Sequence, residues 1–304
     1  MKHTSWKITP LSRKPLICNN NKIKYLSPLN DNIIKKAWLD KIPIILKTYI
    51  LDKFPNCIIP NREHPYETFL NEYVNYYDFT RFAHIIPNNH IITLSSKEVN
   101  NMLVLCLLFQ KGDFVGRLFS EEHIHLINPE LLEKIENYLD NENTGVFVKT
   151  SFKSGKHGIK LFPSFTTLDV MNNLIHSNDV LLSLMCRENI SLIFRKWNYN
   201  IDKTNEFRLF IEDSELTNIS QTYPSIHMNI SKENADKYLT LMIDFWTKIS
   251  PKINELAMDY TIDVSVHNDD VYIIEINSGG KWSSSASCLF DYETMKPYEF
   301  LYVM

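Results

Sequence analysis

The 304-residue chain has few cysteines, and they form no recognisable metal or redox motif. The five are widely scattered and odd in number, with no C-x-x-C pair: Cys18, Cys57, Cys106, Cys186 and Cys288. This pattern excludes a disulfide framework and a zinc site, and it is typical of reduced thiols in a cytosolic protein. We therefore expect a cytoplasmic protein that does not depend on disulfides.

Long apolar runs and an excess of one charge are also missing. The longest apolar run, residues 102–109, is far too short to span a bilayer, and the N-terminus has no apolar signal region behind its charges. The formal net charge is -4, from 32 Lys and Arg against 36 Asp and Glu. This balance argues against bulk electrostatic binding to nucleic acid or to a membrane. We expect a soluble protein.

Hydrophobic residues make up 44% of the chain, and its length fits about two domains at the usual ~150 residues each. The first part predicts helices at residues 33–54, 67–82, 96–110 and 129–139. The polar stretch 140–145 then predicts a boundary, with a mainly helical N-terminal region, residues 1–140, followed by a domain of residues 141–304.

Strands and helices are mixed in residues 141–304. We expect strands at 146–150, 191–197, 206–212, 216–220, 261–267 and 271–277, and helices at 167–176 and 234–249. Short strands mixed with helices, and an antiparallel pair at the end, predict an α+β fold.

The last two strands predict a hairpin with one wholly apolar face. Alternation puts Ile262, Val264 and Val266 on that face in the first strand. A three-residue turn at 268–270 would pair them, in this order, with Ile276, Ile274 and Tyr272. We expect this turn, because a two-residue turn would set Asp263 against Ile274 and break the pattern.

The same register places Asp263 opposite Glu275, with Asn277 on the same face. Two facing carboxylates repel each other by about 0.2–1 kcal/mol unless a cation lies between them. Magnesium is the natural candidate, because it takes one or two protein carboxylates and completes its octahedron with phosphate oxygens and water. An exposed hairpin with solvated acids is the alternative.

A second group of residues suits phosphate. Lys149 ends the apolar strand 146–148 and must project towards a counter-charge, because burying an unpaired lysine is very costly. The loop 151–158 follows, rich in small and basic residues whose backbone amides could cradle phosphate oxygens. A solvated basic turn is the alternative reading of this loop.

Two later strands add cations. Arg195, Lys196 and Trp197 close the apolar strand 192–194 and offer two charges beside a ring that could pack on a purine, although core packing of Trp197 is equally consistent. Arg208 lies inside another apolar strand. An arginine in such a position belongs either to a buried ion pair or to an oxyanion site.

In this order the segments resemble the cell division cycle protein 123 family of ATP-grasp proteins, over roughly residues 130–290. The matching stretches are 146–149 with its loop, 192–197, 206–211 running on to 219–221, 260–264 and 274–277. The resemblance implies an ATP-grasp-like, two-lobed C-terminal region that binds ATP and Mg²⁺ in a cleft.

The resemblance also implies roles for individual residues. Lys149 and Arg208 contact the phosphates and are the catalytic candidates, and Asp263, Glu275 and Asn277 hold magnesium. Further nucleotide-binding residues are implied at Ser151, Lys156, Gly158, Arg195, Lys196 and Trp197. The chain departs from the family pattern at Gly155, at His157 and in the segment 278–282.

For function, the resemblance implies an assembly factor for translation initiation factor 2 that acts through its gamma subunit. An ATP-dependent carboxylate–amine ligase acting on a peptide or small molecule is the alternative, because both functions use the same phosphate cradle. Lys281 and the serines at 283–285 and 287 could form an acceptor pocket for a ligase, or a flexible surface loop.

Overall fold

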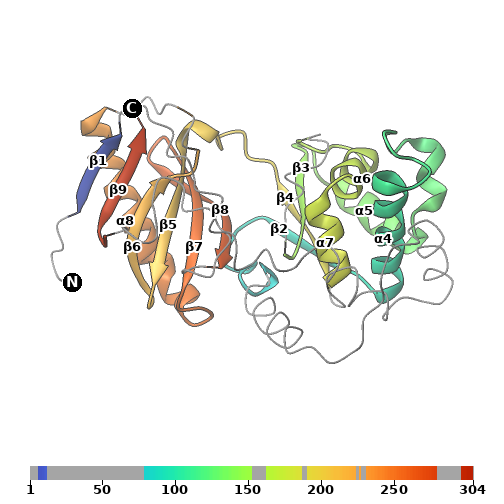
Figure 1. The fold of residues 1–304 in the computed structure, drawn as a ribbon, viewed down its shortest axis with the longest axis horizontal. Helices are drawn as coiled ribbons and strands as arrows, with labels where there is room; N and C mark the ends of the chain where they lie inside the picture. The colour runs from blue at the N-terminus through green and yellow to red at the C-terminus, as the bar shows by residue number, and fades with distance from the viewer. Residues whose placement is uncertain are drawn as a thin grey trace. The chain divides into compact units, whose positions relative to one another are not determined.

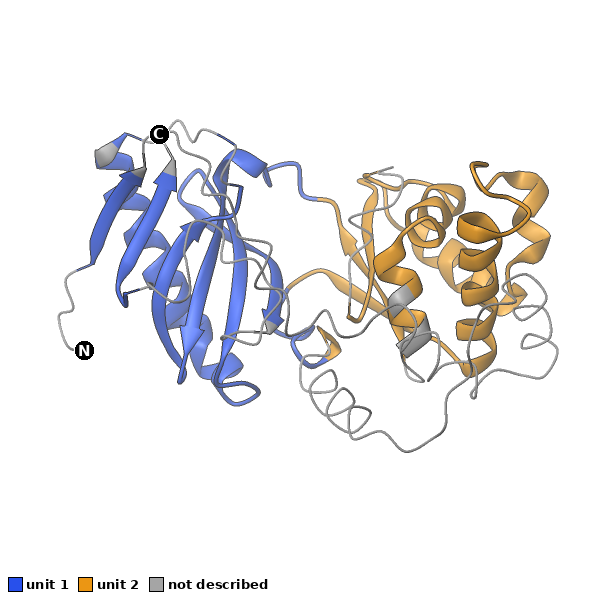
Figure 2. Cartoon of the chain, in the orientation of Figure 1, with its two compact units in different colours: residues 1–28, 81–86, 198–304 blue, residues 29–80, 87–197 orange. Residues whose placement is uncertain are grey.

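The computed structural model describes residues 6–11, 79–152, 162–186, 190–223, 226, 231–278 and 296–303. The chain forms two compact units (Figure 2): unit 1 comprises residues 1–28, 81–86 and 198–304, and unit 2 comprises residues 29–80 and 87–197. The boundary expected between residues 140 and 141 falls inside unit 2. The predicted division into residues 1–140 and 141–304 therefore differs from the division into compact units. The predicted division stays a prediction.

The described residues of unit 1 form a mixed sheet and one long helix. Its elements are β1 (Lys7–Leu11), η4 (Lys203–Asn205), β5 (Glu206–Glu212), β6 (Glu215–Gln221), α8 (Lys232–Asn254), β7 (Tyr260–His267), β8 (Asp270–Ser278) and β9 (Glu299–Val303). The six strands lie in the order β1-β9-β6-β5-β7-β8 (Figure 1). Strand β9 runs parallel to β1 and β6, and the other neighbours are antiparallel.

Helix α8 covers the apolar face of this sheet. The ring of Tyr238 in α8 meets the ring of Phe207 in β5 edge-on, with their centroids 5.8 Å apart. Phe207 is fully buried. Because neighbouring residues of a strand point to opposite faces, Arg208 lies on the face away from α8.

The helix is longer than the predicted 234–249, because it continues through Pro251 to Asn254. A proline inside a helix removes one backbone donor and leaves the carbonyl four residues earlier without its usual partner. Here that carbonyl belongs to Thr247, and it accepts a hydrogen bond from the Ser250 hydroxyl at 3.4 Å. This local substitute helps the last turn to form after the proline.

The hairpin of β7 and β8 has a two-residue turn, so the expected three-residue turn is wrong. Asn268 and Asp269 form the turn with φ of 48° and 71°. Positive φ at both central residues is the requirement of a type I′ turn, which Asn and Asp tolerate.

A β-bulge in β8 restores part of the expected register. Ile274 is the extra residue, and beyond it Asp263 faces Glu275 and Ile262 faces Ile276, as predicted. On the turn side of the bulge the expected partners are wrong. Val264 and Val266 face, in this order, Ile273 and Val271.

In the described residues of unit 2, four α-helices pack against a three-stranded antiparallel sheet of order β2-β4-β3 (Figure 1). Its elements are β2 (Asn89–Thr93), α4 (Ser96–Lys111), η3 (Glu121–Leu126), α5 (Pro129–Leu139), β3 (Val146–Thr150), α6 (Thr167–Ile175), α7 (Asn178–Cys186) and β4 (Ser191–Lys196). All of the predicted elements between residues 96 and 197 form. The sequence did not predict β2 or α7. The predicted helix 33–54 and most of 67–82 lie outside the described residues, and 79–81 form a 3-10 turn, η2 (Phe79–Arg81).

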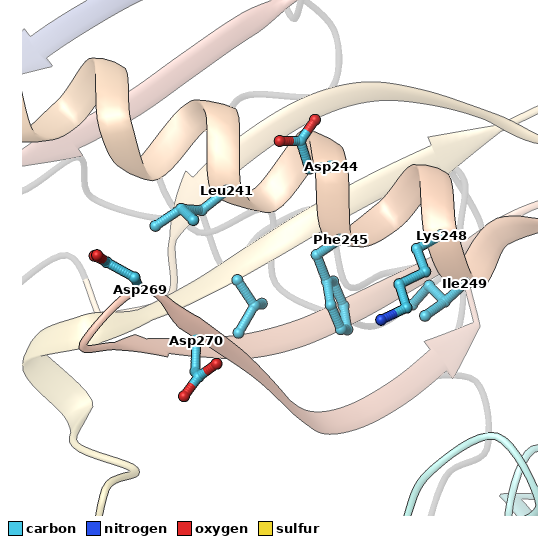
Figure 3. A pocket seen from close by; sticks show the side chains of 8 residues that line it. Leu241, Asp244, Phe245, Lys248, Ile249, Asp269 and Asp270 are labelled. Atoms are coloured by element: carbon cyan, nitrogen blue, oxygen red, sulfur yellow. The ribbon is translucent and has the colours of Figure 1, made fainter.

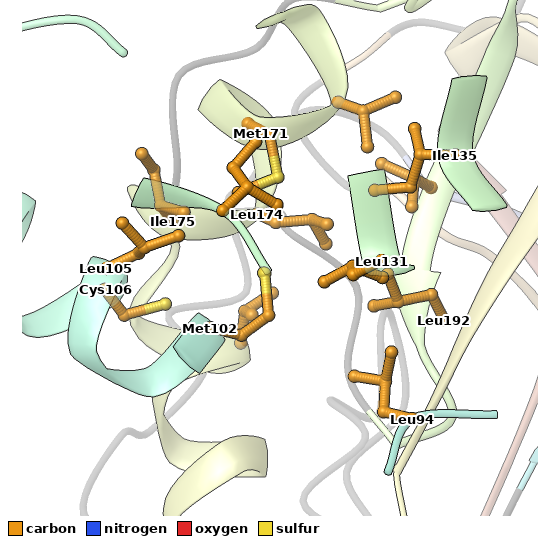
Figure 4. Packing of buried hydrophobic residues seen from close by; sticks show 14 of the residues in the cluster. Leu94, Met102, Leu105, Cys106, Leu131, Ile135, Met171, Leu174, Ile175 and Leu192 are labelled. Atoms are coloured by element: carbon orange, nitrogen blue, oxygen red, sulfur yellow. The ribbon is translucent and has the colours of Figure 1, made fainter. Parts of the chain in front are cut away.

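The helices of unit 2 share one apolar core with the strands (Figure 4). Met102, Leu131 and Leu174 come from α4, α5 and α6, and Leu192 comes from β4. Cys106 lies in the same cluster as a free thiol, and burial raises the pKa of this thiol far above its usual range. Within the described residues, none of the helices is long and apolar enough to cross a membrane.

Candidate functional site

A row of polar side chains crosses four neighbouring strands of unit 1, β6, β5, β7 and β8, on the face away from α8. Ser220 of β6 faces Arg208 of β5, Arg208 faces Asp263 of β7, and Asp263 faces Glu275 of β8. We call these four residues the polar row. All of them are buried, with exposed fractions of 7% or less. Buried charged groups are rarely kept unless they are paired or bind a ligand.

Arg208 and Asp263 form a two-pronged ion pair at the centre of the polar row. The guanidinium Nε donates to Oδ1 at 2.6 Å, and Nη2 donates to Oδ2 at 2.7 Å. This parallel arrangement is the strongest form of charge-assisted hydrogen bond between these side chains. The sequence left open whether Arg208 serves an ion pair or an oxyanion, and in this structure it serves an ion pair.

The other predicted metal ligands lie beside this pair. Glu275 is 7% exposed and directly opposite Asp263. The half-buried Asn277 donates from Nδ2 to Asp263 Oδ2 at 3.4 Å. The structure therefore brings together all three predicted metal ligands, Asp263, Glu275 and Asn277, with the predicted phosphate residue Arg208.

The β-bulge is what aims Glu275 at this cluster. Without the extra residue, the two-residue turn would place Ile274 opposite Asp263 and send Glu275 to the other face. Bulges are over-represented next to functional sites, where they redirect a side chain. The two-residue turn and the bulge together place Asp263 opposite Glu275. The sequence pattern predicted the same pair from a three-residue turn without a bulge.

Lys149, on β3 of unit 2, is buried against an aromatic ring. It is 6% exposed, and its Nζ lies 4.4 Å from the centroid of the Phe79 ring. Such a contact attracts the ammonium electrostatically to the face of the ring. Ser151, two residues later, is 1% exposed, and its hydroxyl accepts the Ser191 backbone N–H at 3.4 Å.

Arg195 and Trp197 lie on the same face of the small sheet as Lys149. Arg195 faces Phe147 across the β3–β4 pair, and Phe147 and Lys149 are two residues apart on β3. Trp197 stacks on Phe162, with centroids 6.1 Å apart and planes at 6°. Phe162 also touches Phe147, at 4.8 Å between centroids. Sequence reasoning missed both phenylalanines, although alternation along β3 already places Phe147 on the face of Lys149.

Lys196 does not join this group. It faces Val146, a core residue, so it lies on the opposite side of the sheet from Arg195. Its exposed Nζ pairs with Glu142 at 3.2 Å. The predicted nucleotide residues Lys156 and Gly158, like Gly155 and His157, lie outside the described residues.

A cavity of about 390 Å³ lies on the other face of the unit 1 sheet, between α8 and the start of β8 (Figure 3). Leu241, Phe245 and Val271 supply apolar walls, and Asp244 and Asp270 lie at its edge. None of the predicted site residues lines it. The candidate site of unit 1 is therefore the polar row with Asn277, not this cavity.

Comparison with known proteins points to one family. The D123 family model matches residues 164–300. A curated protein of Candida albicans, described as a translation initiation factor eIF2 assembly protein, is 25% identical over 181 residues, which are 53% of this chain and 52% of that protein. The chain thus spans about half the length of this curated relative.

Two solved structures share the fold. Cdc123 from Schizosaccharomyces pombe matches with a TM-score of 0.53 and 21% identity, over 73% of this chain and 92% of that one. Its C-terminally truncated form matches with a TM-score of 0.56 and 20% identity, over 77% and 97%. The expected α+β fold is confirmed, and so is the resemblance of this chain to the cell division cycle protein 123 family.

Proposed function

We propose that this protein binds Mg-ATP and acts in the cytoplasm as an assembly factor for translation initiation factor 2. The observation that carries the nucleotide part is the polar row, where two buried carboxylates and an arginine meet on one face of a sheet. The likeness to a protein described as an eIF2 assembly protein supports the second part.

The donor set at Asp263 fits magnesium. Asp263 and Glu275 offer hard carboxylate oxygens from facing positions. The amide nitrogen of Asn277 donates to Asp263 in this structure, and Asn277 would add its amide oxygen after the amide group turns over. In the described part of the chain no three His, Cys, Asp or Glu side chains gather as metal ligands. Two carboxylates suffice for magnesium, which takes its remaining ligands from phosphate and water. The bound ion would neutralise phosphate charge.

Arg208 would bind the terminal phosphate in this proposal. Its guanidinium has five N–H groups, and the ion pair with Asp263 uses two of them, so Arg208 can contact a phosphate and keep this ion pair. Magnesium at Asp263 and a phosphate at Arg208 would lie close together with opposite charges. Nucleotide and magnesium would therefore favour each other's binding.

In unit 2 the proposal assigns phosphate contacts to Lys149, Ser151 and Arg195. The ring of Trp197, which stacks on Phe162, would pack on the base, and Phe147 supports Phe162. Lys196 is less suited to contact the phosphates, because it lies on the other face of the sheet and pairs with Glu142. Lys156 and Gly158 remain predicted phosphate-loop residues.

Direct binding to the purified gamma subunit of translation initiation factor 2 tests the assembly function. We expect a complex on gel filtration when ATP and Mg²⁺ are present, with little ADP released by the protein alone. Absence of a complex, together with ADP release stimulated by amino acids or peptides, would refute the assembly function and favour the ligase.

A further inference from the structure

Two hydroxyl groups flank Asp263 on β7. Thr261 and Ser265 are 1% and 0% exposed. Neither Thr261 Oγ1 nor Ser265 Oγ has a hydrogen-bond partner among the described residues. Two unsatisfied hydroxyls at positions i−2 and i+2 around a candidate metal ligand call for a physical explanation.

Strand geometry places both hydroxyls on the face of the polar row. Residues two apart on a strand share a face, so Thr261, Asp263 and Ser265 all lie on the side away from α8. Across the sheet, Thr261 faces Asn277 and Ser265 faces Glu206. The two hydroxyls therefore lie on either side of the Asp263 carboxylate, and Thr261 also lies beside the predicted ligand Asn277.

The energetic cost of these groups is not offset within the described structure. A buried hydroxyl without a partner costs roughly 1–3 kcal/mol on mutational scales. Valine has nearly the shape of threonine and suits a strand equally well, so it would fill the place of Thr261 without that cost. The neighbouring polar-row hydroxyl of Ser220 does have a partner, the backbone carbonyl of Gln221 at 3.0 Å.

We propose that Thr261 and Ser265 are positioning residues of the magnesium site. Their hydroxyls accept hydrogen bonds from water molecules that the ion retains, and so orient those waters beside Asp263. Magnesium loses its hydration water reluctantly and usually keeps several waters when protein-bound. Groups that hold the ligands of a metal in place typically change its affinity by about 10–100-fold when removed. This inference rests on the proposed binding of Mg-ATP.

The variants Thr261→Val and Ser265→Ala test it. ATP titrations with and without Mg²⁺ give the magnesium dependence, and thermal unfolding without metal gives the stability of the fold. We expect each variant to lose about 10-fold or more of the magnesium-dependent affinity. ATP affinity without metal should stay unchanged, and the unfolding temperature without metal should stay equal or rise. Thr261→Ser should restore the magnesium dependence.

Thr217→Val is the matched control. The half-buried Thr217 hydroxyl lies in the same unit and donates to the Phe210 carbonyl at 3.2 Å. Its loss should lower the unfolding temperature slightly and leave the magnesium dependence unchanged.

Two kinds of result overturn the inference, and they are distinguishable from failure of the proposed function. Wild-type magnesium dependence in both variants would show that the two hydroxyls do not contribute to magnesium binding, although the protein does bind Mg-ATP. A clear fall in metal-free unfolding temperature would mean that the hydroxyls have structural partners. If the unmodified chain shows no magnesium-dependent binding at all, the proposed function fails and this inference fails with it.

Discussion

The two units hold their charged groups in different ways. In unit 1 the charges of the polar row lie mid-strand, are buried, and meet across strands, as Arg208 and Asp263 do. In unit 2, the cations of β4 lie at the strand end, and Lys196 is exposed beside Glu142. A mid-strand charge has its environment set by cross-strand register, whereas a strand-end charge depends on the adjoining loop. The two arrangements should respond very differently to substitution.

Breaking the buried pair should have the largest effect. Arg208→Met leaves Asp263 as an uncompensated buried charge, so we expect a loss of about 3–5 kcal/mol in the free energy of unfolding. Chemical denaturation measures it.

The double variant Arg208→Met/Asp263→Leu is the control for this prediction. Replacing both partners by apolar residues of similar size is often neutral or stabilising, so it should recover most of the loss. A double variant as unstable as the single one would mean that the ion pair is not the reason for the effect.

A glycine of unit 2 should show an intermediate effect. Gly145 has φ of 74°, and its carbonyl accepts the Trp197 N–H at 2.9 Å. An added Cβ would lie 2.8 Å from Pro163 Cβ. Gly145→Ala should therefore cost about 1–2 kcal/mol for the left-handed backbone, with a further ~1–3 kcal/mol for the steric clash.

Gly116→Ala isolates the backbone part of that cost. Gly116 has φ of 79°, and an added Cβ would meet nothing within 4 Å. The Gly116→Ala variant should lose only the free energy of unfolding that the left-handed backbone costs, about 1–2 kcal/mol. Equal losses in the two variants, measured by thermal unfolding, would contradict a clash at Gly145.

The strand-end pair should show the smallest effect. Lys196→Met removes an ion pair whose lysine is exposed, so we expect a change of about 0.2–1 kcal/mol at pH 7 in low salt. A loss comparable with that of Arg208→Met would erase the contrast between the two units.

The pH dependence of this pair has a defined sign. The hydrogen bond from the Thr144 side chain, more than Lys196, lowers the pKa of Glu142. A lowered carboxyl pKa gives stability that is present above the unfolded-state pKa and is lost as the pH falls through the folded-state pKa. The free energy of unfolding should therefore become less dependent on pH in the acid range, and this change should be larger for Thr144→Val than for Lys196→Met. Denaturation at several pH values measures it.

Alternation along strands predicted much of the polar row. It located β5, β7 and β8, and it put Asp263 opposite Glu275. The route to that pairing could not be predicted, because an Asn-Asp turn and a bulge shift the register in compensating ways. The partner of Arg208 also needed the order of the strands, since β5 and β7 are separated in sequence by β6 and α8.

In unit 2 the sequence predicted elements better than side-chain surroundings. Caps such as Asn128 and the capping box of Thr166 and Asp169 fixed the starts of α5 and α6. The placement of Lys196 on the face opposite Arg195 follows from alternation and could have been found. The contact of Lys149 with Phe79 could not, because nothing local relates two residues 70 positions apart.

Calorimetric titration of ATP with and without Mg²⁺, into the unmodified chain and into Glu275→Gln, tests the central claim most directly. We predict tighter ATP binding with Mg²⁺ for the unmodified chain and no such difference for Glu275→Gln, whose fold is checked by thermal unfolding. No binding at millimolar ATP, or full magnesium dependence in Glu275→Gln, would contradict a magnesium–nucleotide site at the polar row.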